Sequence, residues 1–122
     1  MGLTHVAVRL LRSDAKDTYT ADFLVDTGAM DTMAPTSALK KIGIKPVGKD
    51  LYELANGDVV EFEHGIAEME FMGEVIGTRI LFGPEHSEPI LGVVALETAG
   101  FLVDPKNQTL RKLRVRPLKR VA

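Results

Sequence analysis

The sequence predicts an all-β or mostly β protein, a small closed or partly closed β-barrel that carries one or two short helices. Apolar and polar residues alternate along much of the 122-residue chain, as strands with one buried face require. Glycines interrupt this alternation at short intervals, which is typical of turns between strands. Helical periodicity is confined to two short stretches, so repeated βαβ units are not expected.

Five extended runs account for the alternation. They cover residues 6–10, 18–25, 59–63, 66–72 and 75–82. Gly65 and Gly73 are expected to break the chain between the last three runs, and Gly83 to end the last one. A polar turn separates the first two runs, so each run is interpreted as a separate strand.

The two helical stretches are short. Residues 35–42 can form one helix, because Pro35 suits a first helical turn and apolar residues fall on one side of the stretch. Residues 93–99 can form the second, closed by Gly100. Both helices are therefore accessories to a β fold.

The C-terminal end is expected to form a hairpin, because two apolar runs, residues 101–103 and 109–115, flank a turn-forming tetrad. Six of the 15 Lys and Arg residues lie between Arg111 and Arg120, where no acidic residue occurs. Residues 109–122 are thus predicted as a basic strand or tail. Alternation indicates a strand with one solvated face, and contact with a partner or nucleic acid is the alternative.

Composition narrows the function classes, and residues 1–122 are assigned to one domain. The net charge of −2 gives no basic field, so nucleic acid is not expected as a partner. Cysteine is absent, and the three histidines are scattered, so neither a metal nor another cofactor is expected. No run approaches the roughly eighteen apolar residues of a membrane span, and the N-terminus lacks a signal cleavage site. We therefore expect a cytoplasmic protein without membrane contact.

A carboxylate stands directly after a buried apolar strand at Asp26, where residues 23–29 read FLVDTGA. Desolvation penalises an ionised acid there, so Asp26 is either hydrogen-bonded into the structure or positioned for chemistry. In the structural alternative, Asp26 only closes a turn by accepting backbone N–H groups of Gly28 or Ala29. The tripeptide Asp-Thr-Gly alone does not decide between the two.

Three further segments add to the Asp-Thr-Gly motif. Asp31-Thr32 follows the Asp-Thr-Gly-Ala stretch, residues 70–84 form a hairpin pattern ending in Gly-Pro, and Ile90-Leu91-Gly92 precedes a short helix. Together these segments resemble the retropepsins of clan AA, which are single-domain aspartic proteases that work as homodimers. The resemblance covers residues 19–103, in the family's order and near its spacing.

Two carboxylates hydrolyse a peptide when one is ionised and deprotonates a water while the other, protonated, hydrogen-bonds the substrate carbonyl. Carboxyls about 3 Å apart share one proton, because ionising both is costly. The chain holds one Asp-Thr-Gly, so catalysis would require Asp26 from each of two copies related by a two-fold axis. A second copy and a peptide or protein substrate are therefore the expected partners.

The resemblance also implies supporting roles. Thr27 would hydrogen-bond across the dimer to the opposite loop, and Gly28 would let the substrate backbone approach. A flap is expected between residues 51 and 63, with Asn56-Gly57 at its tip, although an ordinary surface hairpin is the alternative. The expected substrate-binding residues are Ala29, Met30, Asp31, Asn56, Gly57, Asp58, Phe82 and Ile90.

The chain departs from the family at Met30, where retroviral members usually carry Asp, and at Val93, where they often carry Arg or Asn. An ion pair between these two positions is therefore lost, and the flap has fewer glycines than viral flaps. The predicted function is a homodimeric aspartic endopeptidase. The alternative is a non-catalytic dimerisation or peptide-binding module of the same fold, and a monomeric barrel would indicate a coincidental motif.

Overall fold

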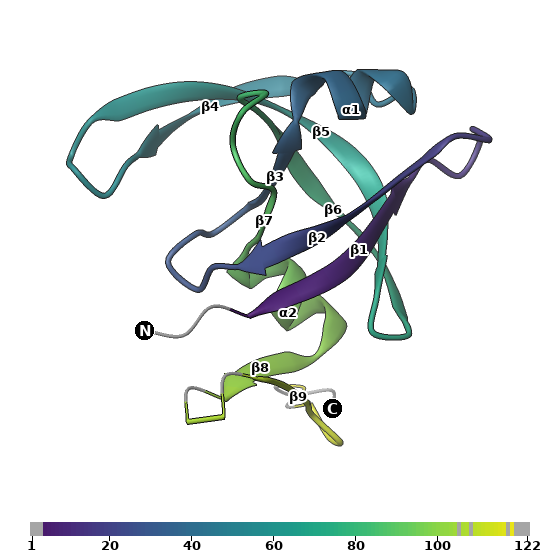
Figure 1. Cartoon of the computed structure of the whole chain (residues 1–122), viewed down its shortest axis with the longest axis vertical. Helices are drawn as coiled ribbons and strands as arrows, with labels where there is room; N and C mark the ends of the chain where they lie inside the picture. Colours follow the sequence, from purple (N-terminus) through teal and green to yellow (C-terminus); the bar gives the residue numbers. More distant parts are fainter. Residues whose placement is uncertain (1–3, 105, 108, 117, 119–122) are drawn as a thin grey trace.

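The computed structural model describes residues 4–104, 106–107, 109–116 and 118. Its strands are β1 (His5–Leu11), β2 (Thr18–Val25), β3 (Thr32–Pro35), β4 (Gly48–Glu53), β5 (Val59–Phe71), β6 (Glu74–Gly83), β7 (Ile90–Leu91), β8 (Phe101–Asp104) and β9 (Thr109–Lys112), and its helices are α1 (Thr36–Lys41) and α2 (Val93–Ala99). Strands predominate, which confirms the mostly β fold class (Figure 1).

Most strands close into a ring. The main sheet has the order β1-β2-β7-β3-β6-β5-β4, and β1 also pairs with β5, so all of these strands except β4 form a closed barrel. β4 lies outside the ring, where it pairs antiparallel with the first part of β5 and extends it as a hairpin (Figure 1). The closing contacts are short, because β2 pairs with β7 at two residues and β1 pairs with β5 at three.

β7 is only two residues long, yet it joins the two sides of the ring. Val25 of β2 pairs in parallel with Leu91, and Met33 of β3 pairs antiparallel on the other side of β7. The chain between β2 and β3 therefore passes around one end of β7. We call this connection, residues 26–31, the active-face loop.

β5 runs without interruption through Gly65, so the predicted break at this glycine is wrong. A Cβ on Gly65 would lie 2.8 Å from both the Ile44 side chain and the Lys45 carbonyl oxygen. This glycine allows close packing and does not make a turn. Gly73 does mark a turn: its φ of 81°, next to φ 49° at Met72, joins β5 to β6.

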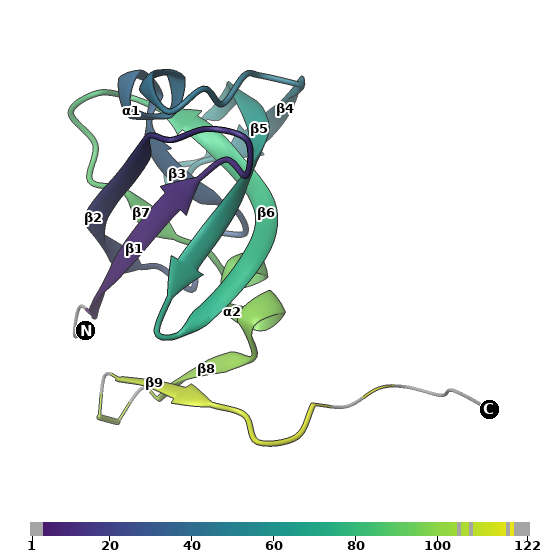
Figure 2. The same cartoon turned by 90° about the vertical axis from the view of Figure 1, so that its right-hand side faces the viewer.

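The C-terminal hairpin is confirmed, since β8 and β9 pair antiparallel in a sheet of their own (Figure 2). β9 ends at Lys112, three residues before the predicted end of the strand. Of the predicted basic tail, residues 117 and 119–122 lie outside the described residues. Figure 2 shows this hairpin beyond the barrel, on the side of α2.

The described part of the basic tail binds the end of α2. Lys112 donates to the Ala99 carbonyl at 2.7 Å, pairs with Glu74 at 2.9 Å and lies 5.0 Å from the Phe101 ring centroid. Arg116 donates to the carbonyls of Thr98 and Ala99. Cations beside the last carbonyls of a helix satisfy unpaired acceptors and oppose the helix dipole.

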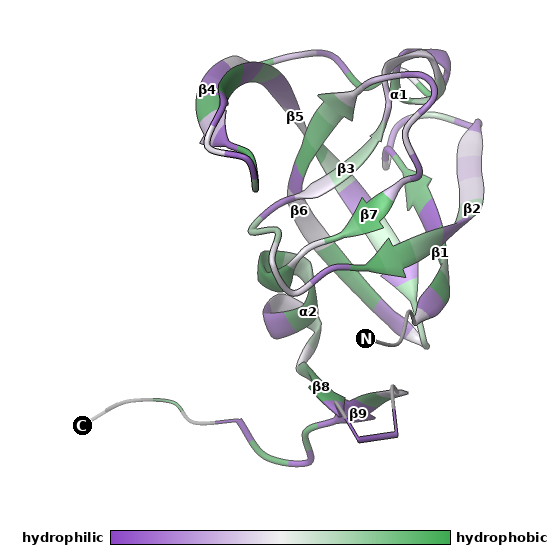
Figure 3. Ribbon diagram, turned by 60° about the vertical axis from the view of Figure 1, so that its left-hand side comes forward, coloured by the Kyte–Doolittle hydropathy of each residue, from purple (hydrophilic) through white to green (hydrophobic). Residues whose placement is uncertain are grey.

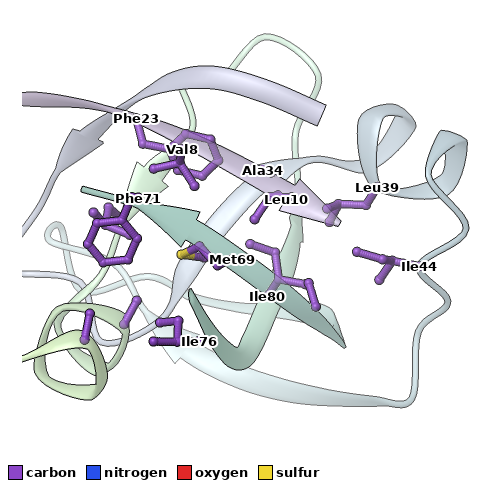
Figure 4. Packing of buried hydrophobic residues seen from close by; sticks show 14 of the residues in the cluster. Val8, Leu10, Phe23, Ala34, Leu39, Ile44, Met69, Phe71, Ile76 and Ile80 are labelled. Atoms are coloured by element: carbon purple, nitrogen blue, oxygen red, sulfur yellow. The ribbon is translucent and has the colours of Figure 1, made fainter. Parts of the chain in front are cut away.

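The core fills the inside of the ring. Its completely buried members include Val8, Leu10, Phe23, Met69, Ile80 and Leu91. Apolar and polar stretches alternate along the strands (Figure 3), and the inward side chains converge from several strands (Figure 4). Burying each such side chain contributes about 1.5–3 kcal/mol. The rings of Phe71 and Phe101, with centroids 5.7 Å apart, join the barrel to the C-terminal hairpin.

Both predicted helices are present. α1 follows directly after Pro35 and buries Leu39 against the core. α2 buries one face, including Leu96 and Ala99, and ends at Gly100 with a left-handed φ of 82°. Among the residues that the structure describes, no helix combines the length and the apolar character that crossing a membrane requires.

Candidate active site

Asp26 stands at the point where β2 leaves the sheet. Its backbone N–H donates to the Leu91 carbonyl at 3.0 Å, and its own carbonyl accepts from Ala29 at 3.1 Å. Carboxylate Oδ1 accepts the Gly28 N–H at 2.9 Å, as the turn-closing alternative expects. Oδ2 has no hydrogen bond or ion pair to any described residue. One oxygen therefore fixes the side chain while the other is left available.

The active-face loop is attached to the first turn of α2. The N–H of Val93 donates to the Ala29 carbonyl at 2.9 Å, and the N–H of Val94 donates to the Met30 carbonyl at 3.0 Å. The first N–H groups of a helix have no partner within the helix, so here they are used to hold the loop. The position of Asp26 thus depends on a helix that lies far along the sequence.

Gly92 and Thr32 lock this junction. A Cβ on Gly92 would lie 2.6 Å from the carbonyl carbon and oxygen of Asp31 and 2.7 Å from the Met30 carbonyl oxygen, so only glycine is accommodated. The Gly92 N–H donates to the buried Thr32 Oγ1 at 3.0 Å. Two chain segments separated by some sixty residues are therefore in backbone contact beneath the loop.

Thr32→Val is expected to lower the free energy of unfolding by about 1–3 kcal/mol, because the buried Gly92 N–H would lose its acceptor while side-chain shape is nearly kept. Urea unfolding followed by circular dichroism measures the change. Thr109→Val, at an exposed position of β9, is the control and should change stability little. Equal stability of both variants would mean that this hydrogen bond contributes nothing.

A cleft of about 440 Å³ lies between the active-face loop and the β4–β5 hairpin. Its lining residues are Asp26, Gly28, Ala29, Met30, Asp31, Met33, Tyr52, Glu53, Leu54, Ala55, Phe62, Leu81 and Ile90. Figure 3 shows the hairpin projecting beyond the barrel. The cleft is mainly apolar, and among the residues that the structure describes the only charged side chains that line it are carboxylates.

Several predicted site residues come together here. Ala29, Met30, Asp31 and Ile90 line the cleft with Asp26, and Met30 is 68% exposed. Thr27 and Gly28 lie exposed on the active-face loop. The predicted grouping of the loop residues is thus seen in the structure, whereas their roles stay predictions.

The prediction that Phe82 binds substrate needs correction. It is 6% exposed and belongs to the core cluster, while Leu81, the preceding residue, lines the cleft. Successive residues of a strand face opposite sides, so an error of one residue exchanges the core for the cleft. Met33, Phe62 and Leu81 supply apolar wall that the sequence analysis did not identify.

Asn56, Gly57 and Asp58 lie at the tip of the hairpin and do not line the cleft in this structure. The tip is a longer loop than the tight two-residue turn that Asn-Gly favours: Leu54 N–H donates to the Asp58 carbonyl at 2.8 Å. Gly57 has a φ of 91°, which a side chain would disfavour. The hairpin itself was expected, but residues 52–55, which line the cleft, were not among the predicted substrate-binding residues.

Polar contacts link the hairpin to its surroundings. The Tyr52 hydroxyl donates to Asp31 Oδ2 at 2.6 Å, and Asp31 is 9% exposed. Burial, together with this hydrogen bond, raises the pKa of Tyr52 to about 12. Nearer the base, Arg79 Nη1 and His64 Nδ1 each lie 2.8 Å from Asp50 Oδ2. Among the described residues no cluster of His, Asp and Glu could hold a metal ion.

Comparison with a family model decides the relationship. A model described as aspartyl protease matches residues 13–95, more than half of the 122 residues. The chain belongs to the aspartyl protease family. The match includes Asp26 and every segment that supports its loop, up to the first turn of α2. A comparison with curated protein sequences gives no match.

Solved structures show the same fold. The protease of EIAV, complexed with the inhibitor HBY-793, has a TM-score of 0.58 and 20% identity, covering 79% of this chain and 86% of that one. The simian foamy virus (mac) protease has 0.56 and 14%, covering 77% and 92%. The retroviral protease-like domain of Ddi1 from Leishmania major has 0.54 and 14%, covering 93% and 92%. This aspartyl protease family member is therefore retropepsin-like in fold.

Proposed function

We propose that the chain is one subunit of a homodimeric aspartic endopeptidase. The observation that carries the proposal is Asp26 in the cleft, with one oxygen fixed by Gly28 and the other without a partner among the described residues. The other carboxylates that line the cleft are unsuited as the second catalytic carboxylate, because Asp31 is hydrogen-bonded to Tyr52 and Glu53 is on the exposed hairpin. The second carboxylate would therefore be Asp26 of a second copy.

In this dimer the ionised Asp26 accepts a proton from water, and the water oxygen bonds to the peptide carbonyl carbon. The protonated Asp26 of the other copy donates a hydrogen bond to the carbonyl oxygen, which stabilises the charge that develops there. The C–N bond then breaks as the amine nitrogen takes a proton from a carboxyl group. The exposed position of Thr27 next to Asp26 suits contact with the opposite loop.

The β4–β5 hairpin is the proposed flap. It would cover a peptide lying over the active-face loop and exclude water, and an extended peptide could pair with its backbone. Met30, Phe62 and Leu81 would favour apolar substrate side chains. The edges of the β8–β9 sheet are the proposed place for pairing between subunits.

Mixing wild-type chain with an equal amount of Asp26→Asn chain tests the shared site. If subunits exchange randomly and mixed dimers are inactive, activity should be about one quarter of that of the same total amount of wild type. The rate is measured on a peptide selected from a library at pH 4–8. When exchange is complete, activity of one half would show that each chain works alone and would contradict the proposal.

A non-catalytic peptide-binding module is the second candidate. It is favoured by Met30, which is 68% exposed and places a thioether where the family usually has a carboxylate. The same peptide library separates the two functions, because a binding module retains peptides intact at every pH. If the wild-type chain cleaves a peptide and the Asp26→Asn chain does not, the binding-module candidate is excluded.

A further inference from the structure

Tyr52 connects the β4–β5 hairpin to the active-face loop. Its hydroxyl, carried by β4, donates to Oδ2 of Asp31 at 2.6 Å. Within the part of the chain that the structure describes, no other hydrogen bond or ion pair joins residues 48–63 to residues 26–31. The Tyr52–Asp31 hydrogen bond is therefore the polar contact that joins the hairpin to the active-face loop.

The Asp31 end of this contact is fixed. Asp31 is 9% exposed, and its carbonyl group packs directly on Gly92. The preceding residue, Met30, accepts a hydrogen bond from the first turn of α2. A carboxylate held in this way is a stationary acceptor, so any movement between hairpin and loop has to come from the Tyr52 side.

Tyr52 marks the last anchored position along the hairpin. Towards the base, Asp50 contacts both His64 and Arg79, and the Tyr52 ring meets Phe62 edge-on with centroids 5.9 Å apart. Beyond Tyr52, the bonds of residues 54–58 in the described structure are internal to the tip, and these residues are exposed. The hairpin thus consists of a braced base and a tip that is free of the barrel.

We propose that Tyr52 is a positioning residue whose hydroxyl holds the hairpin closed over the Asp26 cleft. Asp31 is then the fixed latch point and not a free carboxylate for substrate. Opening the cleft at Tyr52 requires breaking a hydrogen bond to a carboxylate, while the tip can move without breaking it. The proposal rests on the proposed function only for its kinetic consequence, because the latch itself is a structural property.

Tyr52→Phe removes the hydroxyl and keeps the ring against Phe62. Tyr19→Phe is the matched control, because Tyr19 is the chain's only other tyrosine and lies on β2, outside the cleft lining. The chain has no cysteine, so nitroxide labels can be placed cleanly at Val59→Cys, exposed near the tip, and Lys41→Cys, exposed on α1. Double electron–electron resonance then measures their separation, with unlabelled chain in excess.

The expected result is a single narrow distance for the unaltered hairpin and for Tyr19→Phe. Tyr52→Phe should add a second, displaced population that exceeds the wild-type open population about tenfold. Asp31→Asn keeps an acceptor oxygen and should give an intermediate change. Distance distributions for Tyr52→Phe and wild type that superimpose, with both proteins folded by circular dichroism, would overturn the proposal.

Cleavage kinetics supply the second readout. Because the hairpin of the Tyr52→Phe variant closes less often over bound peptide, KM should rise about tenfold, while kcat should stay within about threefold of wild type. A fall in kcat with unchanged KM would contradict a role in closure. If no variant cleaves any peptide but the distance distributions differ as expected, the latch is supported and the peptidase function is the part that fails.

Discussion

Asp26→Asn should abolish peptide cleavage and leave the barrel folded. In the dimer this one change removes both the group that deprotonates water and the group that donates to the carbonyl, so a loss of at least about 10³-fold in kcat is expected. The amide keeps an oxygen for the Gly28 N–H, so the turn should survive. Initial rates on a library-selected peptide give the effect, and sedimentation reports the oligomeric state.

The control is Asp22→Asn, the same chemical change four residues earlier, on β2. Asp22 is exposed and does not line the cleft, so its variant should keep wild-type rates. Turnover by the Asp26 variant within tenfold of wild type would remove Asp26 from the mechanism. If the Asp26 variant lost activity because it had unfolded, the circular dichroism spectrum would show the loss of structure.

Gly92→Ala should be the most destabilising single substitution considered for this chain. The added Cβ would lie 2.6–2.7 Å from three backbone atoms of Asp31 and Met30, and backbone atoms held by α2 cannot yield as a flexible side chain does. Overpacking of this kind costs about 3 kcal/mol or more when no relaxation is available. Thermal unfolding should show a clear drop in Tm, and cleavage should fall with it.

Gly77→Ala is the matched control on β6. A Cβ there meets nothing within 4 Å, and the residue has an ordinary strand conformation, so stability should be unchanged or slightly raised. If Gly92→Ala were as stable as Gly77→Ala, the close approach of Gly92 to the active-face loop would have no energetic importance.

The fold was accessible from the sequence where local patterns are strong. Residues 18–25 and 93–99 were predicted with the observed bounds of β2 and α2, because alternation and a terminal glycine define them locally. β3 and β7 were not predicted as strands, since four and two residues give no periodicity. Their pairing depends on partners distant in sequence, as does the buried role of Gly65.

The site shows the same division. The Asp-Thr-Gly motif located the active-face loop, and the resemblance related the position of Val93 to that of Met30, whereas the close approach of Gly92 to the loop was not predicted. The contact between Tyr52 and Asp31 could not be predicted, because it depends on how far the hairpin bends over the loop. For Phe82 the strand was predicted correctly, but the residue assigned to the cleft was wrong by one position. Which side of β6 meets the cleft depends on its register against β3, which the sequence does not show.

The attachment of the active-face loop to residues 91–94 has a consequence for biosynthesis. Asp26 leaves the ribosome well before the groups that hold its loop, because the Leu91 carbonyl and the N–H groups of Val93 and Val94 are made some sixty-five residues later. Long-range closure of this kind comes late in folding. A growing chain would therefore carry its reactive acid without a site, and would acquire the site only after residues 91–94 have emerged.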